Sequence, residues 1–133
     1  MNDGFKLDIV NPEKSFLSKE NVSEVVVPAY EGEIGILKNH ISIISFLKPG
    51  LLKVFETDSK EENYYVEDGI IEFKNNCLSI LTSNIFDIKK IDKNKVRDIL
   101  TEAEKESQNQ DMSDQAKYLV DHKIEVLKSL TLN

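Results

Sequence analysis

The feature that most constrains the fold is a change of pattern near residue 88. All five glycines and all three prolines lie before Ile88, where they separate short apolar runs. Behind Ile88, apolar residues recur with the spacing of one face of a helix. That spacing runs through Val96, Ile99, Leu100 and Ala103. The chain therefore divides into a β-rich domain, residues 1–88, and a helical domain, residues 89–133.

The β-rich domain consists of many short predicted strands. Phe5–Ile9 alternates apolar and polar residues with the period of a half-buried strand. Val22–Val27 is rich in β-branched residues and is predicted to end at Pro28. The other apolar or alternating runs are Ile41–Leu47, Leu51–Phe55, Tyr64–Val66, Ile70–Phe73 and Leu78–Leu81. Short strands without helix-length inserts predict an antiparallel β-sandwich or barrel rather than a parallel βαβ fold.

The helical domain is predicted to be an antiparallel two-helix hairpin. Asp92 is placed to cap the first helix, and the polar stretch Ser107–Ser113 separates that helix from a second. The apolar face of the second helix comprises Ala116, Leu119, Val120, Ile124, Leu127 and Leu130. Because a two-helix hairpin buries little surface by itself, it must pack on the sandwich, on a partner, or on each in turn.

Charge and hydropathy exclude several classes of direct partner. The formal net charge is -7, and the acidic excess lies in the β-rich domain. Nucleic acids and anionic membranes are poor partners for such a surface, because phosphate contacts need clustered Lys and Arg. The longest apolar clusters, such as Ile41–Leu47, are too short to span a membrane. Membrane association is therefore expected only through another protein.

No pattern of residues predicts an active site, a cofactor or a metal centre. There is no glycine-rich phosphate loop and no GxSxG motif. The two histidines, His40 and His122, are too few for a histidine-rich metal site, and His122 is expected to be solvated. Cys77 is expected to be a small buried residue. Glu31 and Glu33 could form an acid/base pair in a small hydrolase, but a charged turn is the simpler interpretation.

The segment from Pro28 to His40 is unusual within the β-rich domain. It places Gly32 and Gly35 three residues apart between predicted strands. That spacing predicts positive φ or a close backbone approach. From the residues alone, the segment is either a folded turn or a surface loop that contacts another chain.

This segment resembles the ATP synthase epsilon chain family. The run from Glu31 to His40 matches the family pattern E-G-E-x-G-x-L-x-x-H. Weaker matches occur in the family's order at Val25–Pro28, Lys48–Gly50, Val66–Glu72 and Leu78–Thr82. In the third of these, Asp68 replaces a glycine, which is tolerable if the position does not need positive φ. The resemblance covers essentially the whole chain.

The resemblance implies a β-sandwich with a C-terminal hairpin in the central stalk of a proton-translocating F-type ATP synthase. Family members bind the gamma subunit and the c ring, turn with the rotor and have no active site of their own. Bacterial members also inhibit ATP hydrolysis through the hairpin, which implies contact with alpha and beta. The implied location is the cytoplasmic face of the bacterial plasma membrane, or an equivalent energy-coupling membrane, reached only through the complex.

The resemblance also implies which residues contact the rotor. These are Glu31, Gly32, Glu33, Gly35 and His40. By the same resemblance, Glu33 faces the polar loops of the c ring and His40 faces gamma.

Some family members bind ATP through an I/L-D-x-x-R-A motif in the hairpin. The matching residues here are Ile91, Asp92 and Lys95, followed by Val96. Lys95 replaces the arginine and lacks the planar fork that grips phosphate or base in two places, and Val96 replaces the alanine. The sequence therefore predicts weak or absent ATP binding.

Two other functions stay open from the residues alone. One is a free-standing ligand-binding β-sandwich, which needs a concave apolar pocket with converging polar groups. The other is the small hydrolase with Glu31 and Glu33. Both predict ligand binding or activity in the isolated chain, whereas a rotor subunit predicts stable capture by gamma.

Overall fold

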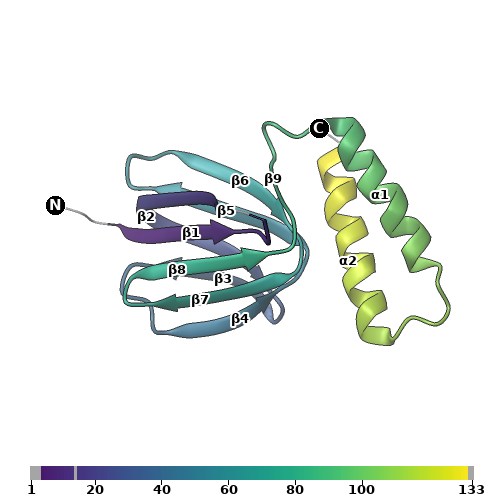
Figure 1. The fold of residues 1–133 in the computed structure, drawn as a ribbon, viewed down its shortest axis with the longest axis horizontal. Coiled ribbons are helices and arrows are strands. Elements are labelled where there is room, and N and C mark those ends of the chain that lie inside the picture. Colours follow the sequence, from purple (N-terminus) through teal and green to yellow (C-terminus); the bar gives the residue numbers. More distant parts are fainter. Residues whose placement is uncertain (1–3, 14, 132–133) are drawn as a thin grey trace.

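The computed structural model describes residues 4–13 and 15–131, which form a sandwich of strands followed by two helices (Figure 1). The strands are β1 Phe5–Val10, β2 Ser15–Ala29, β3 Gly32–Leu37, β4 Ile43–Leu47, β5 Gly50–Glu56, β6 Glu61–Val66, β7 Gly69–Lys74, β8 Cys77–Thr82 and β9 Ile85–Asp87. The helices are α1 Lys93–Ser107 and α2 Asp114–Thr131. The change of pattern near residue 88 predicts the two helices, and they lie side by side at one end of the sandwich.

The long strand β2 belongs to both layers of the sandwich. Its first half pairs with β1, and its second half pairs with β3 and β5. One layer has the order β1-β8-β7-β4, and the other has the order β3-β2-β5-β6-β9. The register of β2 against β5 shifts between Val22 and Glu24. Such an irregularity lets a strand bend from one layer into the next.

One strand pair departs from the expected antiparallel pattern. β1 and β8 pair in parallel, with Leu7 opposite Leu78 and Ile9 opposite Ile80. A parallel pair needs a long connection, and here the chain between the two strands, which builds the rest of the sandwich, supplies it. Local alternation cannot reveal this pairing, because the two strands come from opposite ends of the β-rich domain.

The sequence patterns missed β3 and β9 and underestimated β2. The first half of β2 is mostly polar and exposed, so it carries no apolar period. β2 also continues through Pro28 to Ala29. Pro28 has no N–H to donate, but its carbonyl oxygen accepts a hydrogen bond from Lys48 N at 3.0 Å. β9 has only three residues, which is too short for a recognisable period.

The main core fills the space between the two layers. Phe5 of β1 and Phe73 of β7 meet edge to face, with ring centroids 5.4 Å apart. In β8, Leu78 and Ile80 point inward, so Cys77 points outward and is half-buried. The expectation of a buried Cys77 was wrong, because an apolar run does not show which alternate residues face the core.

The two helices begin where the sequence predicts. Asp92 caps α1, and its Oδ1 accepts a hydrogen bond from Asn94 N at 2.9 Å. Ser113 does the same for α2, since its Oγ accepts from Ala116 N at 3.1 Å. Residues 108–113 form the link between them.

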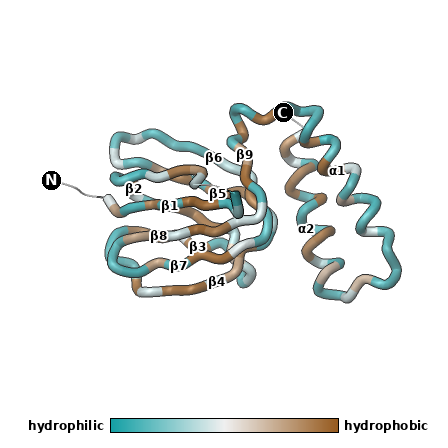
Figure 2. The backbone as a smooth tube through the Cα atoms, in the orientation of Figure 1, coloured by the Kyte–Doolittle hydropathy of each residue, from teal (hydrophilic) through white to brown (hydrophobic). Residues whose placement is uncertain are grey.

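A second, smaller apolar cluster joins the helical hairpin to the sandwich. It is centred on the fully buried Tyr65 of β6 and includes Val96 of α1 and Leu127 of α2. Phe86 of β9 stacks on Tyr65 with ring centroids 6.3 Å apart. Figure 2 shows hydrophobic residues concentrated in the strands and in α2, with a hydrophilic link between the helices. The hairpin therefore rests on a small part of the sandwich and leaves the main core closed.

Candidate functional site

The segment from Glu31 to His40 is a turn, an edge strand and a second turn, whereas the sequence analysis allowed a folded turn or a surface loop and missed the strand. The strand is β3, and it pairs with β2 from Gly32 opposite Ala29 to Leu37 opposite Glu24. Ile34 and Ile36 face the core, and the exposed Glu33 and Leu37 face outward. This alternation is present in the sequence, but two glycines within one short run are typical of a turn and obscured it.

The two glycines of β3 have different roles. Gly32 has a φ of 137°, which favours glycine, and it closes the turn from β2. Gly35 is not among the described residues with positive φ. A Cβ at Gly35 would lie 3.0 Å from the flexible carboxylate of Glu24 and meet no backbone. The prediction of positive φ or close backbone approach is therefore confirmed at Gly32 and wrong at Gly35.

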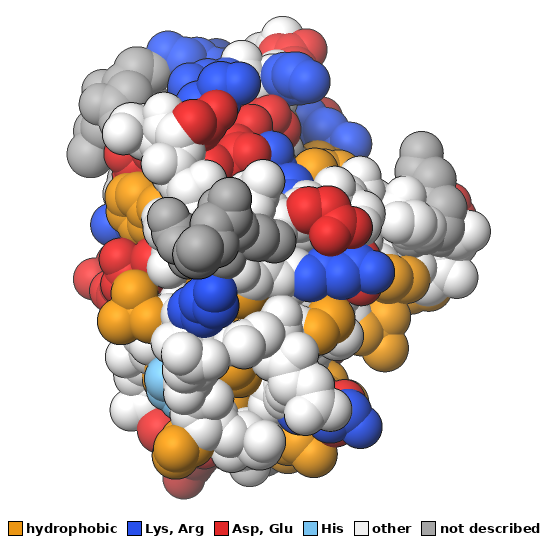
Figure 3. Space-filling model, turned by 90° about the vertical axis from the view of Figure 1, so that its left-hand side faces the viewer, with side chains coloured by type: hydrophobic (Ala, Val, Ile, Leu, Met, Phe, Trp, Pro, Cys, Tyr) orange, Lys and Arg blue, Asp and Glu red, His pale blue; other side chains and the backbone are white. Residues whose placement is uncertain are grey.

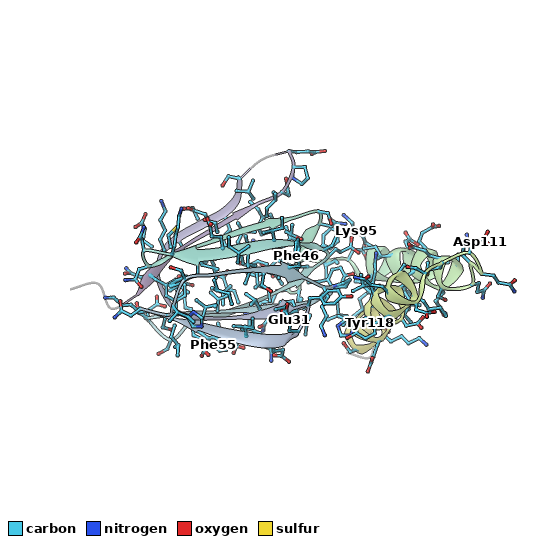
Figure 4. All side chains as sticks on the ribbon, turned by 90° about the horizontal axis from the view of Figure 1, so that it is seen from below. Glu31, Phe46, Phe55, Lys95, Asp111 and Tyr118 are labelled. Atoms are coloured by element: carbon cyan, nitrogen blue, oxygen red, sulfur yellow. The ribbon has the colours of Figure 1, made fainter. Side chains whose placement is uncertain are left out.

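Glu31 and His40 lie at opposite ends of β3. Figure 4 shows Glu31 beside the hairpin, near Phe46 and Tyr118. Glu31 Oε2 accepts a hydrogen bond from Ser45 Oγ at 3.0 Å. At the far end, the His40 backbone N–H donates to Leu37 O at 3.0 Å.

The environment of the two carboxylates does not favour an acid/base pair. Glu31 lines a groove of about 800 Å³ between the sandwich and α2, and Glu33 is not part of its lining. Glu33 is exposed on the edge strand instead. General acid/base catalysis needs both groups to converge on one reacting atom. The groove and the edge strand therefore provide no shared site for a hydrolase.

A strip of exposed apolar side chains crosses the outer face of the layer that contains β1, β8, β7 and β4. The members of this apolar strip are Val10, Ile44, Phe46, Ile70 and Leu81. Strand pairing makes the strip continuous, because Phe46 lies opposite Ile70, Ile70 opposite Leu81, and Leu81 opposite Val10. The side chains of Ile44 and Phe46 are 69% and 61% exposed. A continuous apolar surface on a rigid sheet is typical of a protein–protein contact.

The apolar strip continues toward His40. Ile41, the residue after His40, is 78% exposed and leads into β4. The His40 ring packs edge to face on Phe73 at a centroid distance of 5.9 Å. His40 therefore packs on a core residue in the turn before β4, whereas Glu33 lies on the edge strand of the other layer. The sequence missed the strip, because five of the seven residues of Ile41–Leu47 are apolar and apolar residues occur on both faces of the strand.

The residues of the ATP motif gather in a groove of about 890 Å³ between the sandwich and the start of α1. Asp92 uses its carboxylate to cap α1. The Lys95 ammonium lies 4.3 Å from the ring centroid of Phe86, a cation–π contact. Ile91 packs against the second apolar cluster. The three residues are brought together, but each already has a structural partner.

We expect calorimetric titration of the isolated chain with ATP to show no tight site. The ammonium of Lys95 cannot make the bidentate contact of an arginine, and it is already placed over Phe86. The matched variant is Lys95→Arg, which restores the planar fork and should tighten binding if the lysine is the cause. A dissociation constant of about 1 µM for the unaltered chain would contradict the prediction.

Other candidate chemistry is limited in the described part of the chain. No cluster of three or more His, Cys, Asp or Glu side chains suited to a metal ion occurs among residues 4–13 and 15–131. His122 was expected to be solvated, but it is half-buried and stacks on Tyr118 of the same helix, with ring centroids 6.3 Å apart. The pattern of α2 could not show this, because the sandwich covers part of the helix face opposite its apolar stripe.

Charges of both signs occur on the face of the sandwich that Figure 3 shows. Figure 3 shows the end of the sandwich remote from the hairpin, where acidic, basic and apolar side chains are mixed. Neither described helix is both long and apolar enough to cross a membrane.

Comparison with known proteins agrees with these features. The family model of the ATP synthase delta/epsilon chain β-sandwich domain matches residues 4–88. The chain is 69% identical over 130 residues to the ATP synthase epsilon chain of Pelagibacter ubique (strain HTCC1062), covering 98% of this chain and 99% of that protein. It is 29% identical to the mitochondrial ATP synthase subunit delta of Yarrowia lipolytica (strain CLIB 122 / E 150), covering 96% of this chain and 78% of that protein.

A solved structure shares the fold. It is a chain of the Euglena gracilis mitochondrial ATP synthase, with a TM-score of 0.76 and 22% identity. The match covers 99% of this chain and 82% of that chain, so the sandwich and the two helices are both included.

Proposed function

Because the chain belongs to the ATP synthase delta/epsilon chain family, we propose that it is a non-catalytic central-stalk subunit of an F-type ATP synthase. In this role it couples the catalytic head to the c ring through gamma. The observation that carries the proposal is the 69% identity to an epsilon chain, which extends over 98% of this chain and so includes the hairpin. The subunit acts through rigid contacts, without cofactor or active site.

The apolar strip is the surface that we assign to gamma. Phe46, Ile70 and Leu81 project from three adjacent strands, so their relative positions are held by the backbone hydrogen bonds of the sheet. Burial of such a surface stabilises a complex by about 25 cal/mol for each Å² of apolar area. A rotor contact must transmit torque, and a sheet face deforms less than a loop. We assign His40, in the turn that leads into β4, to the same contact.

The edge strand β3 is the surface that we assign to the c ring. β3 pairs only with β2 among the described strands, and its outward residues are Glu33, Gly35 and Leu37. Glu33 therefore lies on a different surface from the apolar strip. Two separate surfaces suit a subunit that binds gamma and the c ring at the same time. Glu31 and Gly32 form the turn at one end of this strand.

The division into two domains, residues 1–88 and 89–133, is part of the proposal. The main core lies within the sandwich, and the hairpin contacts the sandwich through the smaller cluster around Tyr65, the ion pair of Lys123 with Glu67 and the contact of Tyr118 with Lys48. The hairpin can therefore leave the sandwich without opening the main core, and extend along gamma toward alpha and beta. The protein reaches the membrane only as part of the complex, on the cytoplasmic face of a bacterial plasma membrane or its equivalent.

The alternative of a free-standing ligand-binding protein is less well supported. The apolar groove near Glu31 lies between the sandwich and α2 and shares Phe46, Ile70 and Leu81 with the exposed strip. It is thus an extension of a contact surface. A ligand-binding sandwich instead needs a pocket that surrounds most of the ligand.

Cysteine crosslinking in the assembled enzyme tests the assignment. With Cys77 replaced by Ala, we expect Glu33→Cys to crosslink to a c subunit and His40→Cys to crosslink to gamma. Asp58→Cys, in the exposed turn between β5 and β6, is the control and should give neither product. The measurement is the identity of the crosslinked partner by mass spectrometry. Products with alpha or beta from both sites, and none with gamma or c, would exclude the proposed orientation.

A further inference from the structure

The outward side chains of the layer that contains β1, β8, β7 and β4 form three rows across the strands (Figure 1). Strand register defines the rows, because residues that pair across neighbouring strands point to the same side of the sheet. The first row is apolar and comprises Phe46, Ile70, Leu81 and Val10. The second row comprises Ile44, Glu72, Ser79 and Asp8, and the third comprises Lys74, Cys77 and Lys6.

The character of this face changes with distance from the hairpin. The apolar first row lies beside the hairpin, since three of its four members line the groove between the sandwich and α2. Successive rows lie about 7 Å apart, because each step is two residues along a strand. The face therefore changes from apolar to acidic to basic over about 14 Å.

A hollow of about 410 Å³ lies where the first two rows meet. Three members of the apolar strip line it, together with Asp8, Glu72 and Ser79. Ser79 lies between the two carboxylates in the second row, and its small side chain leaves the space above it open. Asp8 and Glu72 lie two strands apart, so their Cα atoms are separated by about 10 Å. The hollow thus has one apolar wall and a carboxylate on either side.

The two carboxylates differ in the partners that they already have. Asp8 Oδ1 accepts a hydrogen bond from Ser18 Oγ at 2.8 Å, and Asp8 Oδ2 lies 3.7 Å from Lys6 Nζ. The Lys6 and Asp8 side chains are 46% and 33% exposed, so this ion pair is weak. No Lys, Arg or His among residues 4–13 and 15–131 forms an ion pair with Glu72. The half-buried Glu72 therefore brings to the hollow a negative charge that no described residue neutralises.

We propose that the hollow receives one basic side chain of gamma, whose apolar neighbours cover the first row. The stem of a lysine or arginine is apolar and can cross the first row while its charged group reaches the carboxylates. An arginine suits the hollow better than a lysine, because its planar guanidinium carries donors on several sides and can bond to Glu72 and Asp8 together. The inference rests on the proposed assignment of the apolar strip to gamma.

The third row restricts how gamma can lie on this face. A basic side chain displaced by one row away from the hairpin would meet Lys6 and Lys74 in place of Asp8 and Glu72. Displaced toward the hairpin, its charge would lie over apolar side chains that cannot replace its water. Like charges and uncompensated charges both disfavour a wrong placement at an interface. The apolar row therefore supplies burial, and the charged rows set the register of the contact.

The test measures binding of the full chain to an F-type ATPase complex that contains gamma and is prepared without this subunit. We expect Glu72→Lys to weaken binding about tenfold or more, because it places a second cation in the hollow. Glu72→Gln keeps the shape of the side chain, and should weaken binding less and reduce its salt dependence. Circular dichroism checks that each variant is folded. Should Glu72→Lys lower the stability of the chain, Glu72→Gln still gives the measurement.

Glu61→Lys is the matched control for Glu72→Lys. Glu61 is an exposed residue of β6, in the other layer of the sandwich. The same change of charge at this position should leave the affinity within about twofold of that of the unaltered chain, because distant exposed charges are screened by salt. Equal loss of affinity with Glu61→Lys and Glu72→Lys would show an effect of net charge and would overturn the inference.

Crosslinking identifies the side chain that enters the hollow. With Cys77 replaced by Ala, Ser79→Cys carries a short photoactivatable group, and mass spectrometry maps the product. We expect a gamma peptide with a lysine or arginine at or beside the crosslinked position. Replacing that residue of gamma by Glu should weaken binding of the unaltered chain and restore binding of Glu72→Lys. A product with c, alpha or beta alone, or a gamma peptide without a basic residue, would contradict the proposal.

Phe46→Ala distinguishes failure of the hollow from failure of the gamma assignment. Phe46 belongs to the apolar row but does not line the hollow. Its truncation should weaken binding about tenfold whether or not a basic side chain enters the hollow. If Phe46→Ala weakens binding while Glu72→Lys does not, the basic side chain is wrong and the gamma assignment stands. If neither change weakens binding, both proposals are wrong.

Discussion

Replacing Gly69 with alanine is expected to destabilise the sandwich by about 3 kcal/mol, the upper part of the range for overpacked sites. A Cβ on Gly69 would lie 2.0 Å from the carbonyl oxygen of Leu81 and 2.8 Å from the Cα of Thr82. Both are backbone atoms of the neighbouring strand β8, where Gly69 lies opposite Thr82. They cannot rotate away, so β7 and β8 must separate at this point. Urea unfolding of the full chain, followed by circular dichroism, measures the loss.

Gly35→Ala is the matched control for Gly69→Ala. Gly35 also lies in a strand, but its added Cβ meets only the end of the Glu24 side chain at 3.0 Å. Because that carboxylate can move, the change in unfolding free energy should stay within about 1 kcal/mol of zero. Equal midpoints for Gly69→Ala and Gly35→Ala would show that the approach of β8 to Gly69 does not limit stability.

The structure also explains how an aspartate can occupy position 68, where the family pattern has a glycine. Asp68 is not among the described residues with positive φ, so the position accepts a side chain. Its Oδ1 accepts a hydrogen bond from Ser83 Oγ at 2.6 Å, and its carbonyl oxygen accepts one from Thr82 Oγ1 at 3.1 Å. The side chain and the carbonyl oxygen of Asp68 therefore both stabilise the turn before β7.

Truncation after Ile88 is expected to leave assembly and ATP synthesis largely intact while raising ATP hydrolysis roughly fivefold or more. The assigned rotor contacts, from Glu33 to the apolar strip, all lie in the sandwich. The hairpin rests on the sandwich through a small apolar cluster and two polar contacts, so we expect that it can exchange this support for a partner at a cost of a few kcal/mol. Rates of ATP hydrolysis and synthesis in membrane vesicles, for full-length and truncated chains, measure the effect.

The truncated chain needs its own control, because removal of the hairpin uncovers Tyr65 and Phe86. A second truncated chain with Phe86→Thr exposes less apolar surface and keeps a residue that suits a strand. Loss of the assembled complex with both truncated chains would show that the hairpin is structural. Unchanged hydrolysis with both would show that it does not inhibit in this protein.

Much of the fold is predictable from short-range patterns in the chain. A strand such as β1 can be recognised in the sequence because its residues face the core and the solvent in alternation. This period of two is visible within six residues. The hairpin can be recognised from the 3.6-residue period of its apolar residues and from Asp92. The Asp92 side chain caps α1 by accepting a hydrogen bond from the backbone of the first turn, two residues later in the chain. These signals depend on neighbours along the chain, so the sequence alone contains them.

Only the tertiary structure shows which residues lie on the outward face of the sandwich. In the run that contains β4, the residues facing out, Ile44 and Phe46, are as apolar as those facing in. Only the pairing of β4 with β7 shows which set lines the core. The rotor-contact residues were named from the family resemblance, but their separation onto two surfaces required the arrangement of the layers.

The sequence by itself determined the two-part architecture, the helix starts and the family, because each is encoded in local periods, caps and motifs. The tertiary structure decided the parallel pairing of β1 with β8, the exposed strip and the ion pair of Lys123 with Glu67. Each of these brings together residues that are far apart in the chain. Their contacts depend on how the layers and the hairpin pack, and burial and the approach of distant charges arise only from that packing.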